Sequence, residues 1–131
     1  RGLDNLIWIW TSEGNDKDWY PGDECVDIIG RDIYNQKDSD VLKFEYQRLT
    51  ADYPDKIVIL SECGGVSTIS AQWSAGAKWG YFMPWYDYER TKDVSDEAFL
   101  ETKHNFADKA WWQDVWKQEF VISRDELPSM K

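Results

Sequence analysis

Histidine and cysteine are scarce in this 131-residue sequence, which contains one histidine, His104, and two cysteines, Cys25 and Cys63. A Ser/His/Asp triad, a histidine-rich metal site or a Cys/His pair would have to use His104, whose polar surroundings suggest a surface position instead. The two cysteines lack the spacing of metal ligands and cannot define a disulfide framework, so their redox state stays open. The sequence therefore indicates neither a metal nor another cofactor.

Long apolar runs and an excess of basic charge are also lacking. No segment approaches the roughly 20 apolar residues that span a membrane. The 15 basic and 25 acidic side chains give a formal net charge of -10, which argues against binding to nucleic acid or to an anionic membrane surface. A neutral partner suits this charge better. The sequence begins at Arg1 without a methionine or a signal-peptide pattern, and we expect it to be part of a longer chain.

Aromatic residues, in contrast, are abundant. They make up 16% of the sequence and include nine tryptophans, more than a core of this size needs for packing alone. Flat apolar faces with polar edges suit sugar rings, whose hydroxyls then reach neighbouring carboxylates and amides. Any single tryptophan is nevertheless more often a packing residue. We therefore expect some of these side chains, and not most, to face a sugar.

Apolar runs of strand length alternate with segments whose apolar residues recur at helical spacing. The predicted strands are Leu6–Trp10, Val26–Ile33, Ile57–Leu60 and Trp79–Trp85. The predicted helices cover about 41–49, 69–77 and 105–119. This alternation predicts an α/β fold in which right-handed βα units build a parallel sheet.

The length fits one domain, and about four βα units amount to half of a β/α (TIM) barrel, which runs to about 250 residues. The alternative is a small open α/β sheet that is complete by itself. Such a doubly wound sheet is expected to carry a glycine-rich phosphate loop after its first strand, and Thr11–Asn15 is not one. The half barrel is therefore the favoured fold.

In β/α barrels the chemistry lies at the C-terminal ends of the strands. The residues at those positions are Trp10 with Glu13, Tyr34 with Asn35, Glu62, and Trp85 with Tyr86. Neighbouring side chains of a strand point to opposite faces. On the second strand we therefore expect Tyr34 to face the barrel interior. On the third we expect Val58, Leu60 and Glu62 to face the interior as well, and Ile57 and Ile59 to face the helices.

Glu62 and Tyr34 match what a retaining glycosidase needs. One carboxylate attacks the anomeric carbon, while a second carboxyl group about 5 to 5.5 Å away protonates the leaving oxygen. A tyrosine hydroxyl can hold the nucleophile in position, so we assign Glu62 as candidate nucleophile and Tyr34 as the group that orients it. The competing interpretation of Glu62 is a surface carboxylate at a strand end. Glu13, in a polar loop, is expected to be solvated, and Asp32 to be structural.

Four segments together resemble a known family. They are Gly2–Trp10, Trp19–Asn35, Ser61–Gly64 and Phe82–Tyr86. They make the sequence similar, over essentially its whole length, to the second half of family 26 glycoside hydrolases, especially the β-mannanases. The most specific part is Trp19–Asn35, with its Trp-Tyr-Pro-Gly-Asp and Gly-Arg-Asp-Ile-Tyr-Asn blocks, followed at a suitable distance by the strand that ends in Glu62.

The resemblance implies that residues 1–131 form the C-terminal half of a glycoside hydrolase β/α barrel whose N-terminal half is missing. Glu62 then matches the family nucleophile, on the seventh barrel strand. Tyr34 matches the tyrosine that hydrogen-bonds this nucleophile, and Trp85 the tryptophan that floors the subsite of the cleaved sugar. The family's acid/base glutamate follows a histidine, and this sequence contains no His-Glu pair.

We therefore expect part of a retaining endo-β-1,4-mannanase acting on mannan, galactomannan or glucomannan, with Trp10 and Tyr86 as further substrate contacts. Mixed-linkage glucan and xylan, cleaved by other members of the family, remain open as substrates. A non-catalytic carbohydrate-binding module and a purely structural half barrel are the alternatives. The 131 residues alone are expected to be inactive, and to pair with the missing half or with a second copy. Because a polysaccharide cannot enter a cell intact, we expect a secreted, periplasmic or cell-surface enzyme.

Overall fold

Four parallel strands form the sheet of this protein. The computed structural model describes residues 5–86, 88, 91–101 and 104–129. The strands are β1 (Ile9–Thr11), β2 (Ile28–Tyr34), β3 (Ile57–Gly64) and β4 (Phe82–Pro84), hydrogen-bonded in that order. The helices are α1 (Ser39–Asp52), α2 (Ile69–Ala75), α3 (Glu97–Glu101) and α4 (Lys109–Val115), with the short 3₁₀ turns η1 (Lys17–Trp19) and η2 (Arg124–Glu126). This confirms the predicted α/β fold with a parallel sheet.

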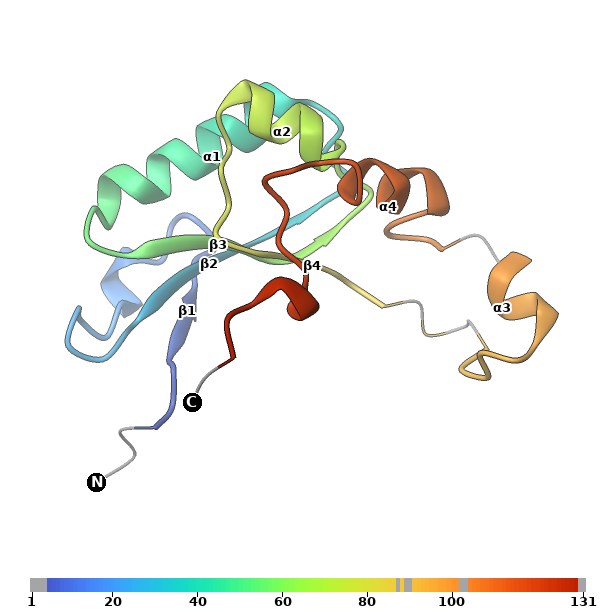
Figure 1. Ribbon diagram of the computed structural model, residues 1–131. Coiled ribbons are helices and arrows are strands. Elements are labelled where there is room, and N and C mark those ends of the chain that lie inside the picture. Colours follow the sequence, from blue (N-terminus) through green and yellow to red (C-terminus); the bar gives the residue numbers. More distant parts are fainter. Residues whose placement is uncertain (1–4, 87, 89–90, 102–103, 130–131) are drawn as a thin grey trace.

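Helices α1 and α2 cover one face of the sheet (Figure 1). The main core lies under them and includes Ile29, Ile33, Leu42, Leu49, Val58 and Leu60. Helix α4 is tied to α2, because the backbone N–H and the hydroxyl of Ser70 both donate to the Asp114 carboxylate, at 2.9 and 2.5 Å. The other face carries Ile57 at one end and Tyr34 at the other, and we call it the open face. Ile57 is 60% exposed there.

The element boundaries differ from the predicted ones at several points. Helix α1 extends beyond the predicted range 41–49 at both ends. Its first turn is capped by Asp38, whose carboxylate accepts the Asp40 backbone N–H at 2.9 Å. Helix α4 is shorter at both ends and begins after Asp108, whose carboxylate accepts the Trp111 N–H at 2.9 Å. Helix α3 was not predicted. No helix in the described part of the chain is long and apolar enough to cross a membrane.

The predicted facing of strand β3 was wrong at Val58 and Leu60. Both are buried in the core under the helices, at 4% and 0% exposed, and not on the open face. Strict alternation would turn Glu62 toward the helices as well. However, the register of β3 shifts between Leu60 and Cys63, where Ser61 is an extra residue. This β-bulge returns Glu62 to the open face and Cys63 to the core.

Candidate active site

The C-terminal edge of the sheet brings Tyr34 and Glu62 together. Tyr34 is the last residue of β2, and Glu62 lies two residues before the end of β3. The Tyr34 hydroxyl donates to Glu62 Oε2 at 2.9 Å. Glu62 is half-buried and Tyr34 is 37% exposed, so the pair is reachable from solvent at the edge of the open face.

The protonation of Tyr34 is controlled by its surroundings. Burial raises the pKa of this phenol, and so do the hydrogen bond to Glu62, the charge of Glu62 and the charge of Asp32. A phenol with its ordinary pKa is already protonated at physiological pH, and the raised pKa extends that range to higher pH. Tyr34 is therefore able to donate a hydrogen bond to the Glu62 carboxylate at physiological pH.

A second polar layer lies directly beneath this pair. The Ser61 hydroxyl donates to Asp32 Oδ1 at 2.7 Å, and the Thr11 hydroxyl donates to Ser61 Oγ at 3.3 Å. Gly30 makes room for these groups, since a Cβ at that position would lie 2.5 Å from Ser61 Oγ. These two hydrogen bonds hold Ser61, the bulge residue, on the open face. The direction of the neighbouring Glu62 side chain is thereby fixed.

The backbone at the ends of β2 and β3 is also fixed. The Asn35 N–H donates to the Gly64 carbonyl at 2.7 Å, and Asn35 has a φ of 54°, in the left-handed region that asparagine tolerates better than most residues. Gly65 has a φ of 62° and lies against the Asn35 side chain. These turns hold the Tyr34 and Glu62 backbones in one register.

Three aromatic side chains gather at the same edge, after strand β4. The Trp85 N–H donates to the Cys63 carbonyl at 2.8 Å, which places Trp85 one strand away from Glu62. The ring centroids of Trp85 lie 5.3 Å from those of Tyr86 and 6.2 Å from those of Tyr88, and Tyr86 and Tyr88 are 4.2 Å apart. Tyr86 is 50% exposed. This cluster presents aromatic surface just beyond the end of β4.

The structure does not bring Trp10 to the Tyr34–Glu62 pair. Trp10 is aligned with Ile29, whose side chain lies in the core, so its indole points to the helix-covered face. There it packs edge-on against Tyr20, with ring centroids 6.1 Å apart. Its geometry is that of a packing residue.

Glu13 and His104 also take structural positions. Glu13 forms an ion pair with Arg31 at 2.9 Å, on the face of β2 that also contacts Glu45 of α1. Its side chain is 67% exposed, in keeping with the expected solvated carboxylate. His104, expected at the surface, is half-buried there. Its Nδ1 accepts the backbone N–H groups of Phe106 and Ala107 at 3.2 and 3.0 Å.

Phe106 is a neighbour of the pair that the sequence did not reveal. Its ring lies edge-on to the Tyr34 ring, with centroids 5.8 Å apart and planes at 75°. Nothing in its local pattern distinguishes it from other residues of a polar stretch, because the contact arises only when the chain returns to the sheet before α4. Among the described residues, no group of three or more His, Cys, Asp or Glu side chains could hold a metal ion.

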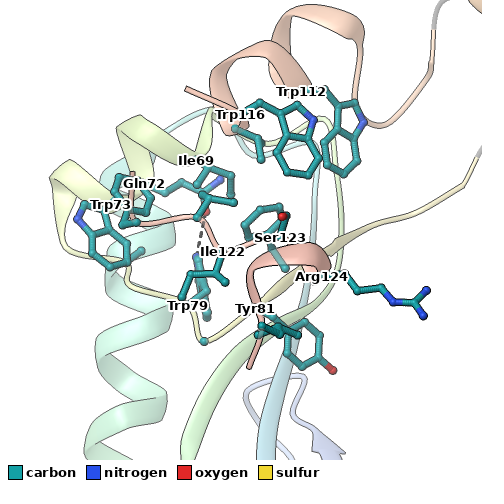
Figure 2. A pocket seen from close by; sticks show the side chains of 17 residues that line it. Ile69, Gln72, Trp73, Trp79, Tyr81, Trp112, Trp116, Ile122, Ser123 and Arg124 are labelled. Atoms are coloured by element: carbon teal, nitrogen blue, oxygen red, sulfur yellow. Dashed lines mark hydrogen bonds between the residues drawn. The ribbon is translucent and has the colours of Figure 1, made fainter. Parts of the chain in front are cut away.

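Two cavities lie near these elements. One, of about 590 Å³, is lined by residues that follow β2 and β3 or precede α4, including Asn35, Lys37, Gly65, His104 and Phe106, but by neither Tyr34 nor Glu62. The other, of about 540 Å³, is mostly apolar and lies between α2, α4, the start of β4 and the C-terminal segment (Figure 2). Its lining includes Trp73, Trp79, Trp112 and Trp116 but neither Tyr34 nor Glu62. It is therefore separate from the carboxylate chemistry.

The chain resembles proteins of one family in sequence. The family model for glycosyl hydrolase family 26 matches residues 1–126. A mannan endo-1,4-beta-mannosidase from Thermothelomyces thermophilus is 27% identical over 128 residues, which are 97% of this chain and 24% of that protein. Mannan endo-1,4-beta-mannosidase A from Piromyces sp. is 30% identical over 129 residues, 98% of this chain and 19% of that protein. The chain thus spans a quarter or less of the length of these relatives.

Solved structures show the same relationship. The family 26 domain of an endo-beta-mannanase/endo-beta-glucanase from Prevotella bryantii aligns with a TM-score of 0.77 at 38% identity, over 95% of this chain and 36% of that one. A beta-mannanase from a symbiotic protist of the termite Reticulitermes speratus, solved with a gluco-manno-oligosaccharide, aligns with a TM-score of 0.70 at 32% identity, over 96% of this chain and 36% of that one.

Proposed function

Since the chain belongs to glycosyl hydrolase family 26, we propose that it is part of a retaining endo-β-1,4-mannanase. Residues 1–131 supply the C-terminal half of its β/α barrel, and the rest of the protein supplies the other half; we call the two together the complete enzyme. The parallel four-stranded sheet supports this assignment. So does the alignment with about a third of each family 26 structure compared above.

The observation that carries the proposal is the hydrogen bond of 2.9 Å from Tyr34 to Glu62 at the C-terminal edge of the sheet. Tyr34 occupies Oε2 of the carboxylate, which leaves Oε1 to attack the anomeric carbon of the bound mannosyl unit. A second carboxyl group, supplied by the other half of the barrel, protonates the glycosidic oxygen as the bond to it breaks. The product of this step is a glycosyl ester on Glu62.

The second step returns the enzyme to its starting state. The second carboxylate takes a proton from a water molecule, whose oxygen attacks the anomeric carbon and displaces Glu62. The configuration of that carbon is inverted twice and hence retained. Tyr34 remains protonated throughout and stabilises the carboxylate that leaves.

Trp85 is proposed to form the floor under the sugar that is cleaved, and Tyr86 to extend this aromatic surface. The support is their position beyond β4, one strand from Glu62, and the exposure of Tyr86. Stacking of an aromatic ring on the apolar face of a sugar positions the ring without competing for its hydroxyl groups. Trp10 is left out of this surface because of its place on the other face of the sheet.

Replacement of Glu62 by glutamine in the complete enzyme tests the proposal. We expect turnover of mannan to fall by several orders of magnitude, because an amide cannot form the glycosyl ester. A 2-deoxy-2-fluoro-mannosyl substrate with a good leaving group should label the wild-type enzyme, and peptide mapping should locate the label on Glu62. Glu119→Gln, at an exposed position, is the matched control and should keep full activity. A label on any other carboxylate would refute the assignment of Glu62.

The proposed substrates are mannan, galactomannan and glucomannan. The support is that the relatives compared above are named mannan endo-1,4-beta-mannosidases, and that one solved structure holds a gluco-manno-oligosaccharide. Initial rates of the complete enzyme on mannan, mixed-linkage β-glucan and xylan decide whether it is a mannanase, a β-glucanase or a xylanase. A protein that binds manno-oligosaccharides equally well with Glu62→Gln and cleaves none of the three polymers would instead be a carbohydrate-binding module.

We also propose that the complete enzyme acts outside the cytoplasm, as a secreted, periplasmic or cell-surface protein. The reason is the size of the proposed substrate, which has to be shortened before uptake. Fractionation of the producing cells with an antibody against this chain tests the location, and an exclusively cytoplasmic signal would contradict it.

A further inference from the structure

We propose that Phe106 is a positioning residue that holds Tyr34 against Glu62; this inference rests on the function proposed above. Phe106 is half-buried and lies in the segment that precedes α4, far along the chain from Tyr34. Its ring meets the Tyr34 ring edge-on, with centroids 5.8 Å apart and planes at 75°. The contact limits the directions that the Tyr34 ring can take while its hydroxyl donates to Glu62.

Phe106 is itself fixed on both sides. Its carbonyl accepts the Gly65 N–H at 2.7 Å, directly beyond the end of β3. Its own N–H donates to His104 Nδ1 at 3.2 Å, and the same nitrogen accepts the Ala107 N–H at 3.0 Å. The segment 104–107 is thus a closed turn that is attached to the strand carrying Glu62.

Gly64 shows how closely the phenylalanine fits this strand. A Cβ at Gly64 would lie 2.4 Å from Phe106 Cδ1 and 2.9 Å from both Cβ and Cγ of Phe106. Phe106 Cβ is fixed by the backbone and does not move with a rotamer change, so a methyl group at Gly64 would displace the segment as well as the ring. The absence of a side chain at Gly64 is therefore what allows Phe106 to reach Tyr34.

Contacts thus lead from His104 to Phe106, from Phe106 to Tyr34 and from Tyr34 to Glu62. Neither Phe106 nor His104 needs to touch the substrate. The Tyr34 ring is 37% exposed, and the bulge fixes Glu62 but not the phenol. Without a neighbour at its edge, Tyr34 would sample other directions and spend less time hydrogen-bonded to the carboxylate. Phe106 supplies that neighbour, and its effect on the reaction is expected to pass through the Tyr34 hydroxyl.

A double-mutant cycle in the complete enzyme tests this inference. Phe106→Leu keeps an apolar side chain of similar volume but removes the ring edge. We expect kcat to fall about three- to tenfold, the range of an edge-to-face aromatic pair, with KM changed less than about twofold. In the Tyr34→Phe background, where the hydroxyl is gone, Phe106→Leu should have little further effect on kcat. Phe106→Tyr, which keeps the ring, should restore most of the activity.

Two more variants separate positioning from general stability. Gly64→Ala should mimic Phe106→Leu, because its methyl group displaces the phenylalanine, and the two changes together should cost less than the product of their separate effects. Phe120→Leu removes a phenylalanine that stacks on Trp73 at 4.0 Å, away from the pair, and should leave kcat unchanged even where it lowers the melting temperature.

The inference would be overturned if the effects of Phe106→Leu and Tyr34→Phe on kcat were independent of each other. If Phe106→Leu lowered kcat by the same factor with and without the Tyr34 hydroxyl, Phe106 would act by another route. The proposed function is judged separately, since Glu62→Gln must abolish turnover. If it did not, the contact would be tested by the Cζ chemical shift of ¹³C-labelled Tyr34, which Phe106→Leu should move in the same direction as Glu62→Gln. An unchanged Cζ shift in Phe106→Leu would refute the contact as well.

Discussion

Tyr34 can be tested by removing a single oxygen atom. In the complete enzyme we expect Tyr34→Phe to lower kcat about ten- to a hundredfold, since a hydrogen bond to a charged group contributes about 1.5 to 3 kcal/mol. Stopped assays of mannan hydrolysis at a fixed pH measure this loss. Tyr81→Phe is the control, since Tyr81 directly precedes β4 and is 41% exposed. An unchanged kcat in Tyr34→Phe would contradict the role of Tyr34.

The two cysteines should differ sharply in reactivity. Burial, with a smaller contribution from the charge of Asp32, raises the pKa of the Cys63 thiol to about 12, whereas Cys25 is exposed. Since the thiolate is the reactive form, iodoacetamide at pH 8 should modify Cys25 in the native protein and Cys63 only after unfolding in urea. Peptide mass mapping measures the two sites separately. Rapid modification of Cys63 in the native protein would show that this part of β3 opens readily.

Some residues could be predicted from the sequence, and others could not. Tyr34 and Glu62 were found because apolar strands of recognisable length end beside them. The reason given for Glu62 was nevertheless incorrect, since alternation from Val58 and Leu60 points it toward the helices and the bulge at Ser61 reverses this. A bulge leaves no clear trace in a single sequence. Phe106 could not be found at all, because its contact is made between distant segments.

At the scale of elements, an ion-pair network joins α1 to β2. Glu45 Oε2 lies 3.0 Å from Arg31 Nε and 2.9 Å from Arg48 Nη2, and its side chain is 20% exposed. Burial acts to raise the pKa of Glu45, but the hydrogen bonds and charges of Arg48 and Arg31 outweigh it, so the pKa is lowered. The network therefore favours the folded state most when Glu45 is ionised.

This lowered pKa predicts how stability changes with acid. A carboxylate with a pKa below its unfolded value of about 4.3 contributes stability above that pH and loses it as pH falls through the folded pKa. Glu45→Gln should therefore lower the free energy of unfolding by about 1 to 2 kcal/mol at pH 7 and by less near pH 3. Urea unfolding of the complete enzyme at both values measures this, with Glu119→Gln as the exposed control. An equal loss at both values would exclude a charge effect.

The existence of the elements was easier to predict than their ends. Helix α1 was found from its apolar spacing, but its start depends on Asp38, and many polar residues could serve as that cap. Strand β4 has only three residues, since Trp79 turns away from the sheet to donate its indole N–H to Gln72 Oε1 at 2.9 Å. Such side-chain contacts decide where an apolar run stops being a strand, and they are not visible in periodicity.

At the scale of the whole molecule, the described part of the chain exposes apolar surface where a barrel would continue. Among the described residues, β1 pairs with β2 alone and β4 with β3 alone, so each of these two strands has an unpaired edge. Ile7, Trp8 and Ile9 are 71%, 53% and 44% exposed beside the edge of β1, and the cavity of Figure 2 opens beside β4. Unpaired parallel edges are normally covered in α/β proteins. In the barrel proposed above, further strands would cover both edges.

The proposed division of the barrel predicts that the isolated 131-residue chain does not hydrolyse mannan. A retaining glycosidase needs a second carboxyl group about 5 to 5.5 Å from the nucleophile. The Asp32 carboxylate accepts a hydrogen bond from the Ser61 hydroxyl, in the polar layer beneath Tyr34 and Glu62. The Glu13 carboxylate forms an ion pair with Arg31 on the helix-covered face of the sheet. Neither is placed to protonate a leaving oxygen above the pair.

Release of reducing sugar from carob galactomannan measures this, with the complete enzyme as the positive control and circular dichroism to show that the isolated chain is folded. We expect no release above background from the isolated chain, and release on addition of the other half of the barrel, if the two halves associate. Turnover by the isolated chain that disappears with Glu62→Gln would mean that these residues contain their own proton donor. The division of the two carboxyl groups between the halves would then be wrong, although Glu62 would still be the nucleophile.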